Sequence, residues 1–230
     1  MKKLTPGMHI RVVSPSASIE HIGGFEANLA AKERLEKLGF TVSFSEHYLE
    51  NDILGSASIE SRVADIHAAF ADESVDAILA TIGGFNCNEL LPYLDFELIA
   101  RNPKIFCGYS DTTALLSAIY SKTGMKTYMG PSYSSFKMDA LQDYQTESWL
   151  KAVSQTSYEL IPSEKWGDNA WYLPDAPLTF HKTEWKVYNH GKAQATVIGG
   201  NLSTFSLLRG TPYAPTDENY VLFVEEAEED

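Results

Sequence analysis

The sequence predicts an α/β fold: a mostly parallel sheet with helices on both faces, followed by the start of a second, incomplete α/β domain. Three observations predict it. Short apolar runs alternate with amphipathic repeats as far as Tyr128, loops rich in tryptophan and proline follow, and strand character returns near Ala195. We expect an N-terminal domain over residues 1–160, and a crossing segment with a partial C-terminal domain over residues 161–230.

The chain begins with a predicted strand, helix and strand. The β-branched residues within 10–13 indicate the first strand, which Ser14-Pro15-Ser16 interrupts as a loop. Apolar positions within 25–38 predict a helix that Gly39 ends, and residues 41–44 predict the second strand.

A second helix and a third strand come next. One face of this helix is apolar, at positions spaced 4, 3 and 4 residues apart: Ile59, Val63, Ile66 and Phe70. Residues 75–82 predict a strand that ends at Gly83-Gly84, and two short helices are expected between residues 88 and 100. The alternation of strands and helices favours parallel pairing throughout this region.

The central stretch is a buried strand at residues 105–107 that restarts as a helix after Ser110. The corner reads Gly108-Tyr109-Ser110-Asp111-Thr112, which matches the G-x-S-x-G elbow of hydrolases except at its last position. Such a corner lifts a hydroxyl above the edge of the sheet and aims helix N–H groups at the same point. Ser110 is therefore a candidate nucleophile. The alternative is that Ser110 only caps the helix.

After Tyr128 the pattern is less regular. A loop leads to a helix predicted over 146–153, and the segment 162–192 is the predicted crossing into the second domain. Strand character resumes at 195–198, and Gly199-Gly200-Asn201 then begins a helix. The run 220–224 is apolar throughout and indicates a buried strand.

Composition excludes several classes of function. The formal net charge of −13 argues against nucleic acid polymers and anionic membrane surfaces as partners. The chain contains no apolar run of the ~20 residues that a membrane span needs, so we expect a cytoplasmic protein. Cys87 and Cys107 lack the spacing of a disulfide framework or a zinc site, and we expect them to be core residues.

A nucleophilic serine needs backbone donors for the oxyanion and a base. Gly83-Gly84 would let main-chain N–H groups approach a ligand closely, although the pair is also typical of a simple tight turn. The base is harder to assign, because none of the histidines lies in a convincing setting. They are His9, His21, His47, His67, His181 and His190.

Several motifs, in order along the chain, resemble those of the S66 serine peptidase family. They are Ser14-Pro15-Ser16, Ile82-Gly83-Gly84-Phe85-Asn86, Gly108-Tyr109-Ser110-Asp111, Gly199-Gly200-Asn201-Leu202, Gly210-Thr211-Pro212-Tyr213 and Leu222-Phe223-Val224-Glu225. The family includes muropeptide LD-carboxypeptidases and MccF-type microcin C immunity proteins, and the resemblance extends over essentially the whole chain.

The resemblance implies a Ser-Glu-His triad with Ser110 as nucleophile and Glu225 as the acid that orients the histidine. It also implies an oxyanion hole made by the backbone N–H groups of Gly84 and Asp111, a homodimer, and neither a cofactor nor a metal. In this family the histidine follows the glutamate, and only five residues follow Glu225 here. We therefore expect the sequence to be C-terminally truncated, to lack its catalytic histidine, and to be inactive or nearly so.

The MccF branch is favoured, because LD-carboxypeptidases resemble R-G-G-Y-G where this chain has Ile82-Gly83-Gly84-Phe85-Asn86. Gly83, Phe85 and Asn86 are thus candidate substrate contacts. The resemblance also implies an aromatic residue that stacks on a nucleobase, and Trp171 is the candidate. The expected substrate is a small peptidyl or aminoacyl nucleotide. One alternative is an LD-carboxypeptidase that removes D-alanine from murein tetrapeptides, and another is a non-catalytic binder of the nucleotide ligand.

Overall fold

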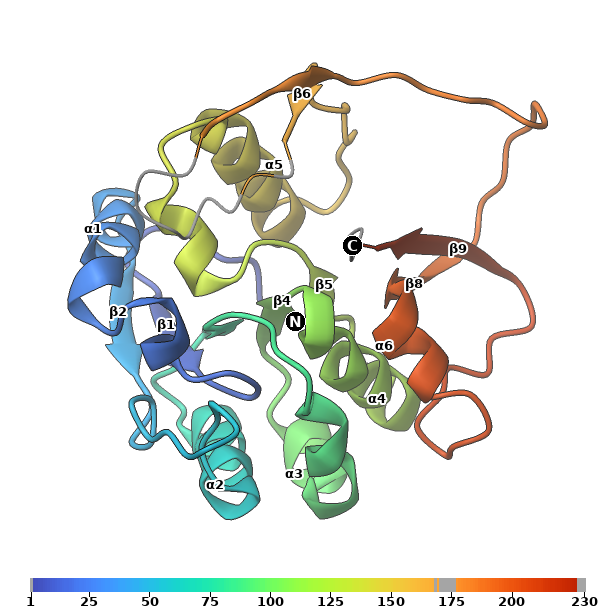
Figure 1. The fold of residues 1–230 in the computed structure, drawn as a ribbon. Coiled ribbons are helices and arrows are strands. Elements are labelled where there is room, and N and C mark those ends of the chain that lie inside the picture. Colours follow the sequence, from blue (N-terminus) through green and yellow to red (C-terminus); the bar gives the residue numbers. More distant parts are fainter. Residues whose placement is uncertain (1, 168, 170–176, 227–230) are drawn as a thin grey trace.

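The computed structural model describes residues 2–167, 169 and 177–226. Its centre is a five-stranded sheet in which every neighbouring pair of strands is parallel, in the order β2-β1-β3-β4-β5. This confirms the predicted fold class (Figure 1). The strands are β1 (His9–Val13), β2 (Thr41–Phe44), β3 (Ala77–Ala80), β4 (Ile105–Gly108) and β5 (Tyr128–Met129). The sequence pattern gave no sign of β5, which has only two residues.

Helices cover both faces of the sheet, as predicted. They are α1 (Leu29–Lys37), α2 (Ile59–Ala71), α3 (Phe96–Arg101), α4 (Thr113–Thr123) and α5 (Gln142–Ser154), with short 3₁₀ helices at Ile19–Ile22, Glu26–Asn28, Cys87–Tyr93, Ser110–Thr112 and Tyr133–Lys137. One buried cluster joins α2, α3 and α4 to Phe106 of β4. The other joins α1 and α5 to the neighbouring residue Ile105. Successive strand residues therefore face opposite layers, as the pleat requires.

Two helices differ at their start from the sequence-based expectation. The helix predicted over 25–38 begins as a 3₁₀ turn, and α1 proper begins only at Leu29. The helix predicted over 146–153 begins earlier, at Gln142, directly after Leu141 enters the left-handed region with φ 56°. Helix ends depend on local caps, which periodicity alone does not locate.

The C-terminal part forms a ribbon beside α4. Strand β8 (Thr196–Asn201) pairs in parallel with β9 (Tyr220–Glu225), and α6 (Leu202–Leu207) connects them. The prediction that residues 220–224 form a strand is confirmed, but the prediction that this strand is buried is wrong. Leu222 and Phe223 are 53% and 55% exposed, because in the described chain β9 pairs only with β8 and no helix layer covers it.

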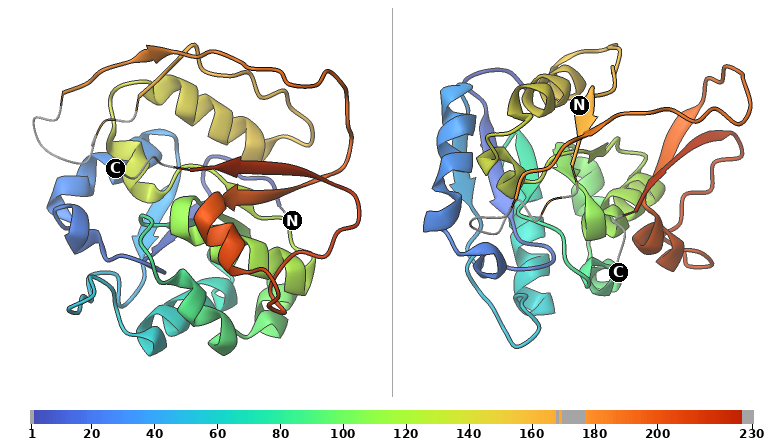
Figure 2. Two further views of the ribbon diagram at one scale, coloured as in Figure 1. Left: turned by 45° about the vertical axis from the view of Figure 1, so that its right-hand side comes forward. Right: turned by 45° about the horizontal axis from the view of Figure 1, so that its top comes forward.

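The crossing segment between these parts is mostly exposed and contains a small antiparallel pair, β6 (Lys165–Trp166) with β7 (His181–Lys182) (Figure 2). The proposed boundary at residue 160 stays a prediction. Cys87 and Cys107 are free and buried, as expected. No helix among the described residues combines the length and the apolar character needed to cross a membrane.

Candidate active site

Ser110 lies directly beyond the carboxyl end of β4, in a strained backbone conformation. Its φ is 57°, in the left-handed region that costs a non-glycine residue about 1–3 kcal/mol. Gly108 permits the sharp corner, since a Cβ there would lie 2.8 Å from Cγ2 of Thr112. The following 3₁₀ turn takes Tyr109 as its N-cap and has no side-chain cap, so the alternative that Ser110 is a capping residue is wrong. The hydroxyl makes no hydrogen bond within the described chain.

The glycine turn faces this serine. A Cβ added to Gly83 would lie 2.7 Å from Oγ of Ser110 and 3.6 Å from the backbone nitrogen of Asp111. At Gly84, with φ 155°, a Cβ would overlap the Ser16 hydroxyl and approach the Ala17 nitrogen to 2.8 Å. Both glycines are therefore required by close packing, and the turn is seated directly against the corner at Ser110.

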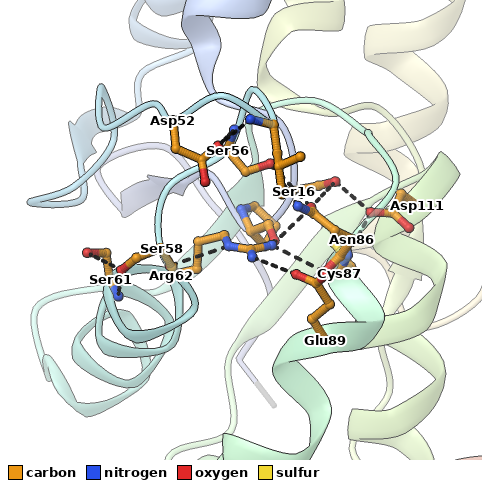
Figure 3. A network of polar contacts seen from close by, with 12 residues as sticks. Ser16, Asp52, Ser56, Ser58, Ser61, Arg62, Asn86, Cys87, Glu89 and Asp111 are labelled. Atoms are coloured by element: carbon orange, nitrogen blue, oxygen red, sulfur yellow. Dashed lines mark hydrogen bonds and ion pairs between the residues drawn. The ribbon is translucent and has the colours of Figure 1, made fainter.

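The side chain of Asp111 connects the surrounding loops. It is 3% exposed, and its carboxylate accepts hydrogen bonds from Oγ of Ser16 at 2.5 Å and from the backbone N–H of Cys87 at 2.8 Å (Figure 3). The loop after β1 and the loop after β3 thus meet at the residue that follows Ser110. This is the carboxyl edge of the sheet, where parallel α/β proteins bind their ligands.

Glu225 ends β9 opposite Asn201 of β8. Its Oε1 is buried without a hydrogen-bond partner in the described structure. Burial raises the pKa of this carboxyl, the negative charge of Glu226 raises it further, and a hydrogen bond with Asn201 opposes the shift. Burial raises the pKa of Tyr109, and the charge of Glu225 raises it further.

Glu226 has a different role. Its carboxylate accepts hydrogen bonds from Nδ2 of Asn201 and from both the backbone N–H and the hydroxyl of Ser203, at the start of α6. The ribbon itself is docked on α4, where the Asn201 N–H donates to Oγ1 of Thr113 at 3.0 Å. Of the two adjacent acids, only Glu225 leaves a buried oxygen without a donor.

Comparison with known proteins agrees with this geometry. The family model described as the LD-carboxypeptidase N-terminal domain matches residues 10–130, and the model of the corresponding C-terminal domain matches residues 194–230. The chain belongs to the S66 peptidase family. The match covers more than half of the chain and includes the corner, the glycine turn and the ribbon.

Relatives of this chain include YocD of Bacillus subtilis (strain 168), which is named a carboxypeptidase. The two are 48% identical over 226 residues, which span 97% of this chain and 69% of YocD. The microcin C7 self-immunity protein MccF of Escherichia coli is 33% identical, over 95% of this chain and 70% of MccF. A solved MccF-like protein from Bacillus anthracis str. Ames superposes with a TM-score of 0.94 at 48% identity, covering 98% of this chain and 69% of that one.

Among the described residues, no histidine forms a hydrogen bond with Ser110 or Glu225. Nδ1 of His47 pairs with Asp65 at 2.8 Å, and Nε2 of His67 accepts the N–H of Asp95. The other histidines are His9, which bonds Ser43 and Ser74, His181, which stacks on Trp166, and His21 and His190.

The remaining candidates differ in their surroundings. Phe85 is 87% exposed beside the glycine turn, where its ring is free to meet a ligand. The Asn86 amide is held within the protein, since its Oδ1 accepts a hydrogen bond from Arg62 at 2.9 Å and its Nδ2 donates to Ser56. Trp171 lies outside the described residues.

Sequence reasoning missed Arg62, which is 3% exposed beneath the site. A signal for it exists. Arg62 lies three residues after Ile59 and four before Ile66, so it lies on the apolar stripe that predicted α2. A charged residue on a buried stripe needs a specific set of partners, and here those partners include the loops that follow β1 and β3.

Proposed function

We propose that this S66 peptidase is a serine hydrolase that cleaves the amide bond between an amino acid or peptide and a nucleotide-like group. The observation that carries the proposal is the strained Ser110, with a hydroxyl that makes no hydrogen bond in the described chain and that lies against the Gly83 turn. In the proposed reaction Oγ attacks the carbonyl carbon and the N–H groups of Gly84 and Asp111 stabilise the oxyanion. The amine leaves with a proton, and water then hydrolyses the acyl-enzyme.

The buried, unpartnered oxygen of Glu225 supports its assignment as the acid that orients a histidine. A neutral or protonated imidazole donates the N–H that this oxygen lacks, and the ionised acid holds the ring in the tautomer that a base needs. We propose that this histidine lies outside the 230 residues, because no described histidine forms a hydrogen bond with Ser110 or Glu225. The 230-residue chain alone is then inactive or nearly so.

The substrate class is inferred from a relative. One solved structure is of MccF in complex with glutamyl sulfamoyl guanosine, and the chain superposes on it with a TM-score of 0.90 at 33% identity. The exposed ring of Phe85 and the backbone of Gly83, which faces Ser110, would contact the acyl part of such a molecule. Trp171 is proposed to contact the base. A homodimer and a cytoplasmic location remain predictions.

The family description favours a second candidate, an LD-carboxypeptidase that removes D-alanine from murein tetrapeptides. The deciding experiment uses the full-length gene product and two substrates, an aminoacyl sulfamoyl adenosine and a murein tetrapeptide, with products followed by mass spectrometry. Release of free amino acid from the first substrate is the expected result. Turnover of the tetrapeptide alone would establish the second candidate, and tight binding without turnover would establish a non-catalytic binder.

Replacing Gly83 with alanine should lower kcat about 100-fold, because the new methyl group must displace the Ser110 hydroxyl that lies 2.7 Å away. The backbone at Gly83 needs no left-handed conformation, so the effect is steric. Gly191→Ala is the matched control, since a Cβ there meets nothing within 4 Å. Steady-state kinetics of both variants of the full-length gene product test this. Equal activity of the two variants would show that the turn does not confine the serine.

A further inference from the structure

The buried guanidinium of Arg62 links the two loops that surround the candidate oxyanion hole. From α2, its Nη1 donates to the carbonyl oxygen of Pro15 at 3.3 Å and to the carbonyl oxygen and Oδ1 of Asn86 at 3.2 and 2.9 Å. Its Nη2 pairs with Glu89 at 3.1 Å. One side chain therefore bonds to the loop after β1 and to the loop after β3.

Asp111 binds the same two loops from the other side. Ser16, which donates to its carboxylate, is the neighbour of Pro15, and Cys87, whose N–H also donates to it, is the neighbour of Asn86. Figure 3 shows Arg62 and Asp111 on opposite sides of Ser16 and Asn86, connected by a continuous set of hydrogen bonds.

The glycine turn lies between these attachments. The carbonyl of Gly83 accepts the N–H of Ala17 at 3.1 Å, and Gly84 packs on the Ser16 hydroxyl. The position of the Gly84 N–H relative to the Asp111 N–H thus depends on how the two loops are joined. Arg62 supplies three of the hydrogen bonds that join them, and none of its hydrogen bonds in the described chain is to Ser110.

We propose that Arg62 is a positioning residue that sets the distance between the two oxyanion donors, an inference that rests on the proposed function. Removing it would leave buried carbonyl groups unsatisfied and let the turn move relative to the corner at Ser110. A misplacement of about 1 Å at a reacting centre can cost about 100-fold in rate. Because the oxyanion exists only in the transition state, the loss falls on kcat rather than on KM.

The test compares Arg62→Met and Arg62→Lys in the full-length gene product. Lysine keeps the charge but cannot span both loops with a planar fork. We expect kcat to fall about 100-fold in the methionine variant and about 10-fold in the lysine variant, with KM within threefold of the wild type. Arg101→Met is the matched control, because Arg101 is an exposed residue of α3 whose side chain only pairs with Glu97.

If Arg62 had only a structural role, its replacement would lower the free energy of unfolding without a fall in kcat at constant KM. If Arg62→Met does not fold, Arg62→Lys and Ser16→Ala, which removes the hydroxyl bonded to Asp111, carry the test. The double mutant should lose less in kcat than the product of the two single losses, because both substitutions change the same spacing between the Gly84 and Asp111 N–H groups. Folded variants with wild-type kcat, or with a rise in KM alone, would overturn the proposal.

Hydrogen exchange on the full-length gene product gives a readout that does not need catalysis. Peptides that cover 83–89 should exchange faster in Arg62→Lys than in the wild type, while peptides from β3 and β4 remain unchanged. If the wild type turns over neither substrate, the proposed function is wrong. The hydrogen-exchange measurement still decides whether Arg62 holds the two loops in place. Unchanged exchange at 83–89 would overturn the positioning role.

Discussion

Replacing Ser110 with alanine is expected to lower kcat/KM of the full-length gene product by about 10⁶, the scale seen when the nucleophile of a serine triad is removed. Among the three heavy atoms nearest to a Cβ placed on Gly83, Oγ of Ser110 is the one hydroxyl oxygen, so the substitution removes the hydroxyl that faces the glycine turn. Ser157→Ala, on an exposed position after α5, is the matched control. Steady-state turnover of the aminoacyl sulfamoyl adenosine measures both.

The backbone strain at Ser110 adds a second expectation. Ser110→Gly should abolish turnover as completely as alanine does, yet raise the free energy of unfolding by about 1 kcal/mol, since glycine adopts a φ of 57° at little cost. Chemical denaturation compares the three proteins. Undiminished turnover in Ser110→Ala would exclude the serine mechanism and leave ligand binding as the function.

Glu225→Gln is expected to lower kcat about 10⁴-fold, the size of the loss when the orienting acid of a triad becomes an amide. The substitution keeps the shape of the side chain but removes the charge that selects the histidine tautomer. Glu226→Gln is the control, because Glu226 is the adjacent residue and the substitution makes the same chemical change. Its carboxylate binds the start of α6, so that variant should lose some stability but keep kcat within about threefold. Equal losses in both variants would refute the assignment of Glu225.

The pH dependence of stability separates function from folding at Glu225. The folded chain holds this proton more tightly than the unfolded chain, because burial raises the pKa above its ordinary value of 4.5. The ionised carboxylate therefore destabilises the fold above the raised pKa, and this cost disappears below about pH 4.5. In the 230-residue chain, Glu225→Gln should melt higher than the wild type at pH 7, with no difference at pH 4. A constant difference in melting temperature across this range would contradict it.

The sequence predicted those parts of the site that depend on local backbone chemistry. The corner at Ser110 follows from a glycine two residues earlier and a helical repeat after it, and the glycine turn follows from the missing Cβ atoms. Arg62 was missed because its role depends on partners 24 to 47 residues away along the chain, which periodicity does not reveal. Glu225 was proposed from the family motif, and only the structure distinguishes its unpartnered oxygen from the bonded carboxylate of Glu226.

The burial of β9 was mispredicted for a related reason. An apolar run indicates that a strand has something to bury, whereas its burial depends on which other elements pack against it. Residues 221–224 satisfy the pattern of a core strand. In the described chain β9 pairs with β8 alone, and the ribbon that they form rests on α4 at one end.

That ribbon has a consequence for how this polypeptide behaves in solution. Within the described residues β8 and β9 pair only with each other, so their outer edges carry unpaired amides next to large apolar side chains such as Phe223. Such edges are templates for strand addition between molecules. The net charge of −13 keeps copies apart at low ionic strength, and salt screens that repulsion. Concentrated, salty preparations should therefore turn viscous or turbid through intermolecular β-pairing, while dilute preparations in low salt stay clear.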